Sequence, residues 1–284
     1  MSAWYRIKKY LQYRTLAGNE HSIHSPFVFK LYTEVISPKE ADNKNKFCVF
    51  DELNKIRAQL LTNSETLEVT DLGAGSKKMR HTRKISDITK YSVVNQKYGE
   101  LLFRLTEYFR PSTILELGTS LGLSALYLSK AAPNAKIITV EGCPNTHEFA
   151  KKLIEKNNSV SPLRGDDQVG FAERNNSRRG STLVNSRFDE YFVNEIANEK
   201  FDLVYIDGNH TYEATIKYFH ELLKITNENS VLIFDDIYWS EGMTKAWEEI
   251  KNHSTVTLSI DLYKIGLIFF RKENKQKEHF CLKY

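Results

Sequence analysis

The sequence has few cysteines and no long apolar runs, the features expected of a secreted, zinc-binding or membrane-spanning protein. Only three cysteines occur among 284 residues, and none are spaced as C-x-x-C, which argues against a disulfide scaffold or a zinc site. The longest apolar runs, such as Ile265–Phe270, are far too short to cross a bilayer. The N-terminal residues contain no uninterrupted apolar segment of the kind a secretory signal needs. We therefore expect a cytoplasmic protein without a transmembrane segment.

An excess of one charge sign is also missing. The chain has 40 Lys and Arg against 36 Asp and Glu, for a net charge of +4. That balance is too mild to indicate a nucleic-acid partner by itself. With 41% hydrophobic and 27% charged residues, the composition is that of an ordinary globular protein large enough to bury a substantial core.

The first 110 residues show no regular alternation of strands and helices. We assign residues 1–92 to a mainly helical N-terminal extension that caps the substrate site, and residues 93–284 to the main domain. The helix candidates before residue 110 are Ala3–Arg14, His24–Ile36, Val49–Leu61 and Tyr98–Phe109.

From Thr113 onward, short apolar strands alternate with helices. This pattern is typical of a parallel sheet that helices cover on both faces. Two final strands, 255–261 and 264–271, are separated by only two residues, so they must form an antiparallel hairpin. The predicted fold is therefore α/β, a Rossmann-like doubly wound seven-stranded sheet of five parallel strands plus a terminal antiparallel hairpin. The five parallel strands are predicted at 113–118, 136–141, 181–186, 201–207 and 230–236, and the helices at 122–131, 144–157, 188–198, 211–225 and 240–251.

Residues 158–180 interrupt this alternation. The segment is rich in Asn, Ser, Gly and Arg and is longer than a usual connection. We interpret it as a flexible surface insertion, with a substrate-contacting lid as the alternative.

Two glycine loops compete as the site of a nucleotide-like ligand. The first, Asp71–Ser76 ("DLGAGS"), is followed by a basic stretch without an apolar stripe. The second, in "ILELGTSLGLSAL" (Ile114–Leu126), has a buried strand before it, a helix after it, and Glu141 at the end of the next strand. A ligand-cradling loop requires those three features, so the second loop is the predicted site and the first is read as a turn near it.

The spacing of the second loop indicates its ligand. Gly118 and Gly122 are four residues apart with no glycine between them, whereas a dinucleotide fingerprint needs a middle glycine for the pyrophosphate. The pattern E-x-G-x-x-x-G resembles the first motif of class I S-adenosylmethionine-dependent methyltransferases, whose sheet has the same seven-stranded plan. The resemblance covers about residues 93–271, and NAD remains the weaker alternative.

This resemblance implies roles for particular residues. Glu116 would brace the loop through backbone N–H groups, Ser124 would meet the cofactor's carboxylate near a helix N-terminus, and Glu141 would accept both ribose hydroxyls. A strand-end cap for Glu116 and a solvated strand end for Glu141 are the alternatives. The other residues implied to contact the cofactor are Gly99, Gly118, Thr119, Ser120, Gly122, Gly142, Ser186 and Asp207.

Three carboxylates follow the fourth and fifth strands. Asp207 ends one strand, and Asp235 and Asp236 end the next, so all three should meet at one edge of the sheet. Like charges this close need a cation, and oxygen ligands suit Mg²⁺ or a similar divalent ion. The alternative is that Asp235 and Asp236 only cap the helix that begins near Ser240.

These acids resemble the metal ligands of the small-molecule O-methyltransferases that include catechol O-methyltransferase. The lysine base of that family lies three residues after the first ligand, and His210 stands there in this sequence. "DGNHTY" (Asp207–Tyr212) matches the D-G-x-H-x-Y pattern of a related sugar- and antibiotic-modifying branch. Histidine can remove a hydroxyl proton near neutral pH, although His210 could instead only cap the helix from Thr211.

The sequence gives less support to other methyltransferase classes and acceptors. The Asn/Asp-Pro-Pro-aromatic loop of amino-group methyltransferases is absent, since that place reads "DGNHTY". The basic, aromatic N-terminal helix leaves an RNA acceptor or a membrane surface open, with packing on the domain or in a homodimer as the alternative. We predict an S-adenosylmethionine-dependent O-methyltransferase of a small sugar or phenolic, assisted by a divalent metal. The alternatives are a metal-independent methyltransferase of RNA or protein, and a non-catalytic binding module.

Overall fold

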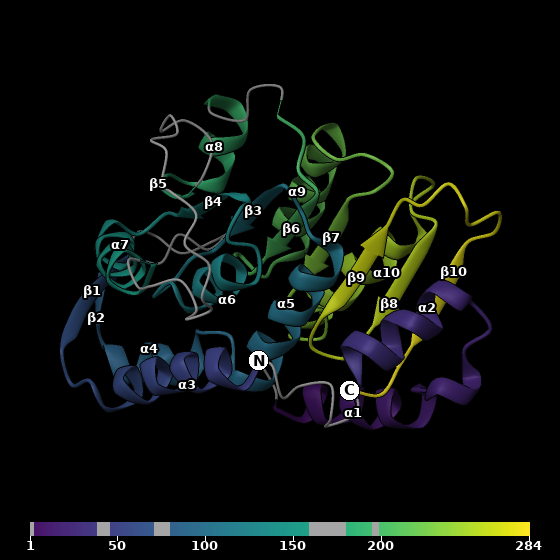
Figure 1. Ribbon diagram of the computed structural model, residues 1–284, viewed down its shortest axis with the longest axis horizontal. Coiled ribbons are helices and arrows are strands. Elements are labelled where there is room, and N and C mark those ends of the chain that lie inside the picture. The colour runs from purple at the N-terminus through teal and green to yellow at the C-terminus, as the bar shows by residue number, and fades with distance from the viewer. Residues whose placement is uncertain (1–2, 39–45, 71–79, 159–179, 195–198) are drawn as a thin grey trace, which may run out of the picture.

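The computed structural model describes residues 3–38, 46–70, 80–158, 180–194 and 199–284. Figure 1 shows a central twisted sheet with helices packed along it. The helical elements before the main sheet are α1 (Ala3–Leu16), η1 (Glu20–Ser22), α2 (Pro26–Leu31), η2 (Tyr32–Ile36), α3 (Phe47–Thr62), α4 (Ile85–Tyr91) and α5 (Gln96–Phe109). The later helices are α6 (Leu123–Ala131), α7 (Pro144–Asn158), α8 (Phe188–Asn194), α9 (Tyr212–Lys224) and α10 (Glu241–Asn252).

The main sheet has eight strands in the order β10-β8-β9-β7-β6-β3-β4-β5. Strands β5, β4, β3, β6 and β7 are parallel, and β9 runs antiparallel to both of its neighbours. The predicted α/β fold, five parallel strands and terminal hairpin are therefore confirmed. The strands are β3 (Thr113–Leu117), β4 (Lys136–Glu141), β5 (Gly180–Asn185), β6 (Leu203–Ile206), β7 (Val231–Phe234), β8 (Leu258–Asp261), β9 (Gly266–Phe269) and β10 (Glu278–Cys281).

The structure adds strands that the sequence did not predict. The sheet has an eighth strand, β10, which pairs parallel with β8 at the edge. A separate antiparallel hairpin, β1 (Thr66–Thr70) with β2 (Arg80–Lys84), lies in the N-terminal extension. The "DLGAGS" loop and nearly all of the 158–180 insertion lie outside the described residues.

Hydrophobic side chains alternate between the two faces of the sheet, as the period of a strand requires. On β6, Leu203 and Tyr205 join one core cluster, while Val204 and Ile206 join the other. The first cluster takes its helical partners from α2, η2, α3, α4, α5, α6 and α7, and the second from α8, α9 and α10. The N-terminal extension therefore shares a hydrophobic core with the sheet, and the domain boundary at residue 92 stays a prediction.

The two ends of the chain are joined to each other. Gly18 donates a backbone hydrogen bond to Cys281, and Lys283 donates one back to Gly18. The buried Tyr13 of α1 donates its hydroxyl to the carbonyl of Leu282 at 2.7 Å. These contacts fix α1 beside the β8–β10 edge of the sheet (Figure 1). No helix among the described residues is long and apolar enough to span a membrane.

Candidate active site

The loop between β3 and α6 has a backbone that favours glycine at its two ends. Gly118 has φ +107 and Gly122 has φ +90, in the region that side-chain-bearing residues rarely adopt. A Cβ on Gly118 would lie 2.1 Å from the carbonyl oxygen of Asp207. The loop therefore packs directly on the end of β6, where the first of the predicted acids stands.

Glu141 holds this loop in place. One of its carboxylate oxygens accepts a hydrogen bond from the backbone N–H of Ser120 at 2.8 Å, and the other accepts from Cys143 at 2.9 Å. Burial raises the pKa of Glu141, and these two bonds oppose that rise. A carboxylate has more lone pairs than these two bonds use, so Glu141 retains acceptor capacity toward the cavity.

Glu116 is braced differently from the prediction. It is fully buried and accepts a hydrogen bond from the hydroxyl of Thr139 on β4 rather than from loop N–H groups. Burial raises the pKa of Glu116 to about 7, against the lowering effect of Ser124 and Thr139. Glu116 of β3 therefore links this strand to β4 and α6 inside the domain.

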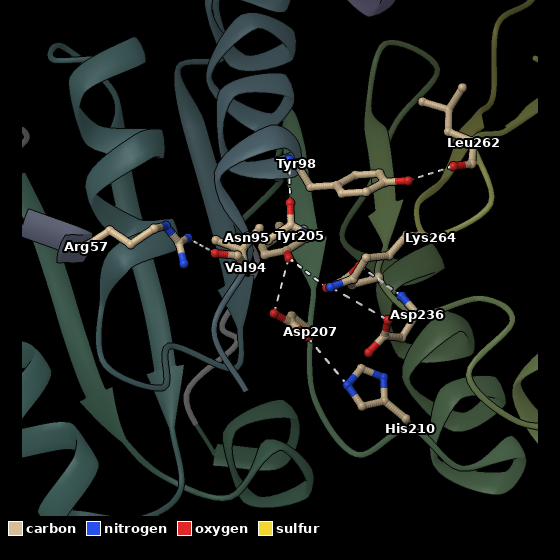
Figure 2. A network of polar contacts seen from close by, with 11 residues as sticks. Arg57, Val94, Asn95, Tyr98, Tyr205, Asp207, His210, Asp236, Leu262 and Lys264 are labelled. Atoms are coloured by element: carbon tan, nitrogen blue, oxygen red, sulfur yellow. Dashed lines mark hydrogen bonds and ion pairs between the residues drawn. The ribbon is translucent and has the colours of Figure 1, made fainter. Parts of the chain in front are cut away.

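The three strand-end acids do come together, with Tyr205 between two of them. The Tyr205 hydroxyl lies 3.2 Å from carboxylate oxygens of both Asp207 and Asp235, as Figure 2 shows for Asp207. Asp235 also accepts a bond from the backbone N–H of Asp236 at 2.9 Å. Burial and the charges of Asp207 and Asp236 raise the pKa of Asp235 well above its usual range.

Two cationic side chains enter the same cluster. His210 Nε2 lies 3.4 Å from Asp207 Oδ1, and Lys264 Nζ lies 3.5 Å from Asp235 Oδ2 and 3.7 Å from Asp236 Oδ1. Burial alone would lower the pKa of His210, but its hydrogen bond to Asp207 and the nearby carboxylates raise it to about 9. Burial would raise the pKa of Asp207, yet His210 and Lys264 lower it overall.

The capping alternatives for these residues do not hold. Ser240 is the N-cap of α10 and accepts from the backbone N–H of Met243 at 3.0 Å. Thr211 is the N-cap of α9 and accepts from Ala214. Asp235, Asp236 and His210 are therefore not needed as helix caps.

The acids open onto a cavity of about 630 Å³. Its lining brings together much of the predicted site, and two segments of the N-terminal extension, the β1–β2 hairpin and residues 91–94, form part of the wall. The predicted residues in the lining are Gly118, Ser120, Glu141, Gly142, Ser186, Asp207, His210, Asp235 and Asp236.

Five predicted cofactor residues are not in the lining: Gly99, Glu116, Thr119, Gly122 and Ser124. Gly99 is explained by packing, because a Cβ there would lie 2.4 Å from the ring of the buried Tyr127. Thr119 contacts Thr139 in the core. Their roles toward a cofactor stay predictions.

Several lining residues were missed from the sequence. The sequence could have pointed to Lys264. One strand of the predicted terminal hairpin runs antiparallel to β7, so the turn of that hairpin lies at the edge of the sheet where β7 ends. Gly266 indeed pairs with Phe234, directly before Asp235. By contrast, His81, Arg83 and Tyr91 lie in the extension, where no pattern pointed to the cavity.

The N-terminal helix packs partly on the domain. Tyr5 donates its hydroxyl to Thr244 at 2.8 Å, and the guanidinium of Arg6 lies 4.6 Å from the ring centre of Trp239, a cavity residue. Trp4 remains 74% exposed. The predicted contact of this helix with the domain is thus present, and a homodimer or RNA contact stays a prediction.

The main sheet has the strand order and the one reversed strand of a class I S-adenosylmethionine-dependent methyltransferase fold. Its glycine loop lies beside the end of β4, where Glu141 stands, as this fold requires. Residues 115–237 match a family described as "Methyltransferase domain". This part of the chain is therefore similar to a methyltransferase domain, in agreement with the resemblance that the sequence predicted.

Comparison with known proteins points to O-methyltransferases. The transmembrane O-methyltransferase of Homo sapiens is 44% identical over 57 residues, 20% of this chain and 20% of that protein. The catechol O-methyltransferase of Niastella koreensis is 26% identical over 145 residues, 51% of this chain and 58% of that protein. The chain thus spans from a fifth to somewhat over half of these relatives' lengths. The structure of the O-methyltransferase from Bacillus cereus in complex with SAH has a TM-score of 0.51 at 16% identity, covering 90% of this chain and 99% of that one.

Proposed function

We propose that this protein transfers the methyl group of S-adenosylmethionine to a hydroxyl of a small molecule, with His210 as the general base. The observation that carries the proposal is the His210–Asp207 pair, which opens onto the same cavity as the glycine loop. The similarity to O-methyltransferases supports an oxygen acceptor.

The volume of the cavity and the polar groups in its lining suit the cofactor. Its volume of about 630 Å³ lies within the usual range for small-molecule sites. Ser120 and Glu141 line the cavity on the loop side, and the spare lone pairs of Glu141 suit the ribose hydroxyls. S-adenosylmethionine, when bound, supplies an electrophilic methyl group on a positively charged sulfur.

The protein's own residues would prepare the acceptor. His210 would take the hydroxyl proton on Nδ1, because its Nε2 faces Asp207. Asp207 would orient the imidazole and stabilise it once charged. Tyr205, fully buried, would hold Asp207 and Asp235 in place through its hydroxyl.

The lining favours a small, planar or sugar-sized acceptor. Phe188, Tyr218, Trp239 and Tyr91 supply aromatic surface, and Arg83 adds a cation. Most pockets for small molecules combine apolar surface with a few oriented polar groups in this way. Lys264 and His210 already pair with the three acids, so the proposed reaction has no step at a divalent metal.

Cofactor binding is the first test. Calorimetric titration of S-adenosylmethionine into the full chain should show one site, and Glu141→Gln should raise the dissociation constant about 10- to 100-fold, the loss of one charge-assisted hydrogen bond. Glu148→Gln, at an exposed glutamate of α7, is the matched control and should leave the binding unchanged. If the wild-type chain does not bind S-adenosylmethionine, the proposed function is wrong.

An acceptor screen follows, with S-adenosylhomocysteine release measured on catechols, other phenolics and sugars. Turnover of one of these classes would support the proposal. Turnover of RNA or protein, with none of the small molecules methylated, would contradict the small-molecule acceptor.

The pH dependence of the reaction should report His210. Because its pKa is raised to about 9 and only the neutral imidazole can take a proton, kcat/KM should rise with pH and level off above about pH 9. The profile would be measured on the accepted substrate between pH 6 and 10. A flat profile across this range would contradict the assignment of His210 as the base.

A further inference from the structure

The side chain of Lys264 forms part of the cluster of acids at the ends of β6 and β7. The residue lies within the β8–β9 turn, where its backbone N–H donates to Leu262 and its carbonyl accepts from Ile237. Tyr98 of α5 donates its hydroxyl to Leu262 at 3.1 Å and so ties this turn to the neighbouring helix. The Lys264 side chain is 25% exposed and lines the cavity. Figure 2 shows it extending toward Asp236 beside Tyr205.

The carboxylates around it already have protein groups as partners. Asp207 has His210 and Tyr205, Asp235 has Tyr205, Lys264 and a backbone N–H, and Asp236 has Lys264. In the part of the chain that the structure describes, no three His, Cys, Asp or Glu side chains are grouped as ligands of one metal ion. The donor set therefore does not fit the divalent ion that the sequence predicted.

The charge balance points the same way. When all groups are ionised, the three carboxylates and the two cations leave one negative charge in the cluster. That charge complements a cofactor with a positively charged sulfur. Lys264 thus supplies part of the compensating positive charge that three neighbouring carboxylates require.

We infer that the ammonium group of Lys264 takes the place of the divalent metal, so that methyl transfer in this protein is metal-independent. This inference rests on the proposed function. An ammonium group has three N–H donors, and two serve Asp235 and Asp236. The third donates to the acceptor oxygen, stabilises the negative charge that develops as His210 removes the proton, and holds the oxygen in the cavity.

Metal binding is measured first, with Mn²⁺ as the probe. Titration of Mn²⁺ into the full chain with S-adenosylmethionine present, followed by electron paramagnetic resonance, should show no stoichiometric site in the wild type. Chelation with EDTA should leave turnover unchanged. One tightly bound Mn²⁺ per chain together with loss of turnover after chelation would overturn the inference, while cofactor binding would keep the proposed function intact.

Variants of Lys264 supply the second measurement. K264M keeps the length of the stem but removes the charge, so kcat should fall about a hundredfold, and the uncovered acids should now bind Mn²⁺. K264R keeps the charge and should retain more activity than K264M, with no Mn²⁺ site. K245M, at an exposed lysine of α10, is the control and should match the wild type in both assays. A K264M chain with unchanged kcat and no Mn²⁺ binding would also overturn the inference, and thermal unfolding would verify that each variant is folded.

Discussion

Replacing His210 with glutamine is expected to lower kcat for methyl transfer by about 10²- to 10⁴-fold and to change cofactor affinity by less than about twofold. Glutamine can still hydrogen-bond to Asp207, but it cannot accept a proton at neutral pH. The side chain is three-quarters buried beside Asp207 and lines the same cavity as Glu141. The loss should therefore appear in the chemical step.

Two assays distinguish an effect on kcat from an effect on cofactor affinity. S-adenosylmethionine binding is followed by calorimetry, and kcat by S-adenosylhomocysteine release on the accepted substrate. His220→Gln, at an exposed histidine of the adjoining helix α9, should behave as the wild type in both. If His210→Gln keeps its kcat, the base is another group; if it loses cofactor binding and kcat in equal measure, His210 has a structural role instead.

The core of the fold could be predicted because its strands and helices differ strongly in pattern. Strands β6 and β7 are buried on both faces, so they read as continuous apolar runs, each ending in acids that lie at one edge of a parallel sheet. The chain order of these strands was enough to bring Asp207, Asp235 and Asp236 together. Neither their partners nor their charge balance followed from the pattern.

What the sequence could not predict depends on pairing between distant segments. Strand β10 is only four residues long and partly exposed, and it exists because it pairs with β8 and connects to Gly18 near the N-terminus. The β1–β2 hairpin is similar: Asn145 of α7 donates to the carbonyl of Glu68 at 2.8 Å. Contacts of this kind add no local periodicity, so a short polar strand looks like a loop.

The same limit explains the metal prediction. Three acids at one edge of a sheet require a compensating charge, and the sequence shows their number but not the register that brings a cation to them. The antiparallel pairing of β9 with β7 places Lys264 beside Asp235. The sequence therefore predicted a divalent ion at these acids without predicting that a lysine pairs with two of them.

Replacing Gly118 with alanine is expected to lower the free energy of unfolding by at least about 3 kcal/mol and to abolish measurable S-adenosylmethionine binding. The added Cβ would lie 2.1 Å from the carbonyl oxygen of Asp207. At that distance the glycine loop and the segment at Asp207 cannot both keep their positions. Relief requires the loop or the end of β6 to move. A shift of β6 would displace Asp207 and with it His210, so that one methyl group affects both the cofactor loop and the proposed base.

Gly180→Ala separates this contact from the backbone conformation. Gly180 also has a positive φ, +146, but nothing lies within 4 Å of a Cβ built there. That variant should therefore lose only about 1 kcal/mol, the strain of the backbone alone, and should bind the cofactor as the wild type does. Chemical denaturation gives the two free energies, and calorimetry gives the two affinities. Equal destabilisation of both variants would mean that the close approach of Gly118 to Asp207 contributes nothing, and the link between the loop and the acids would have to be abandoned.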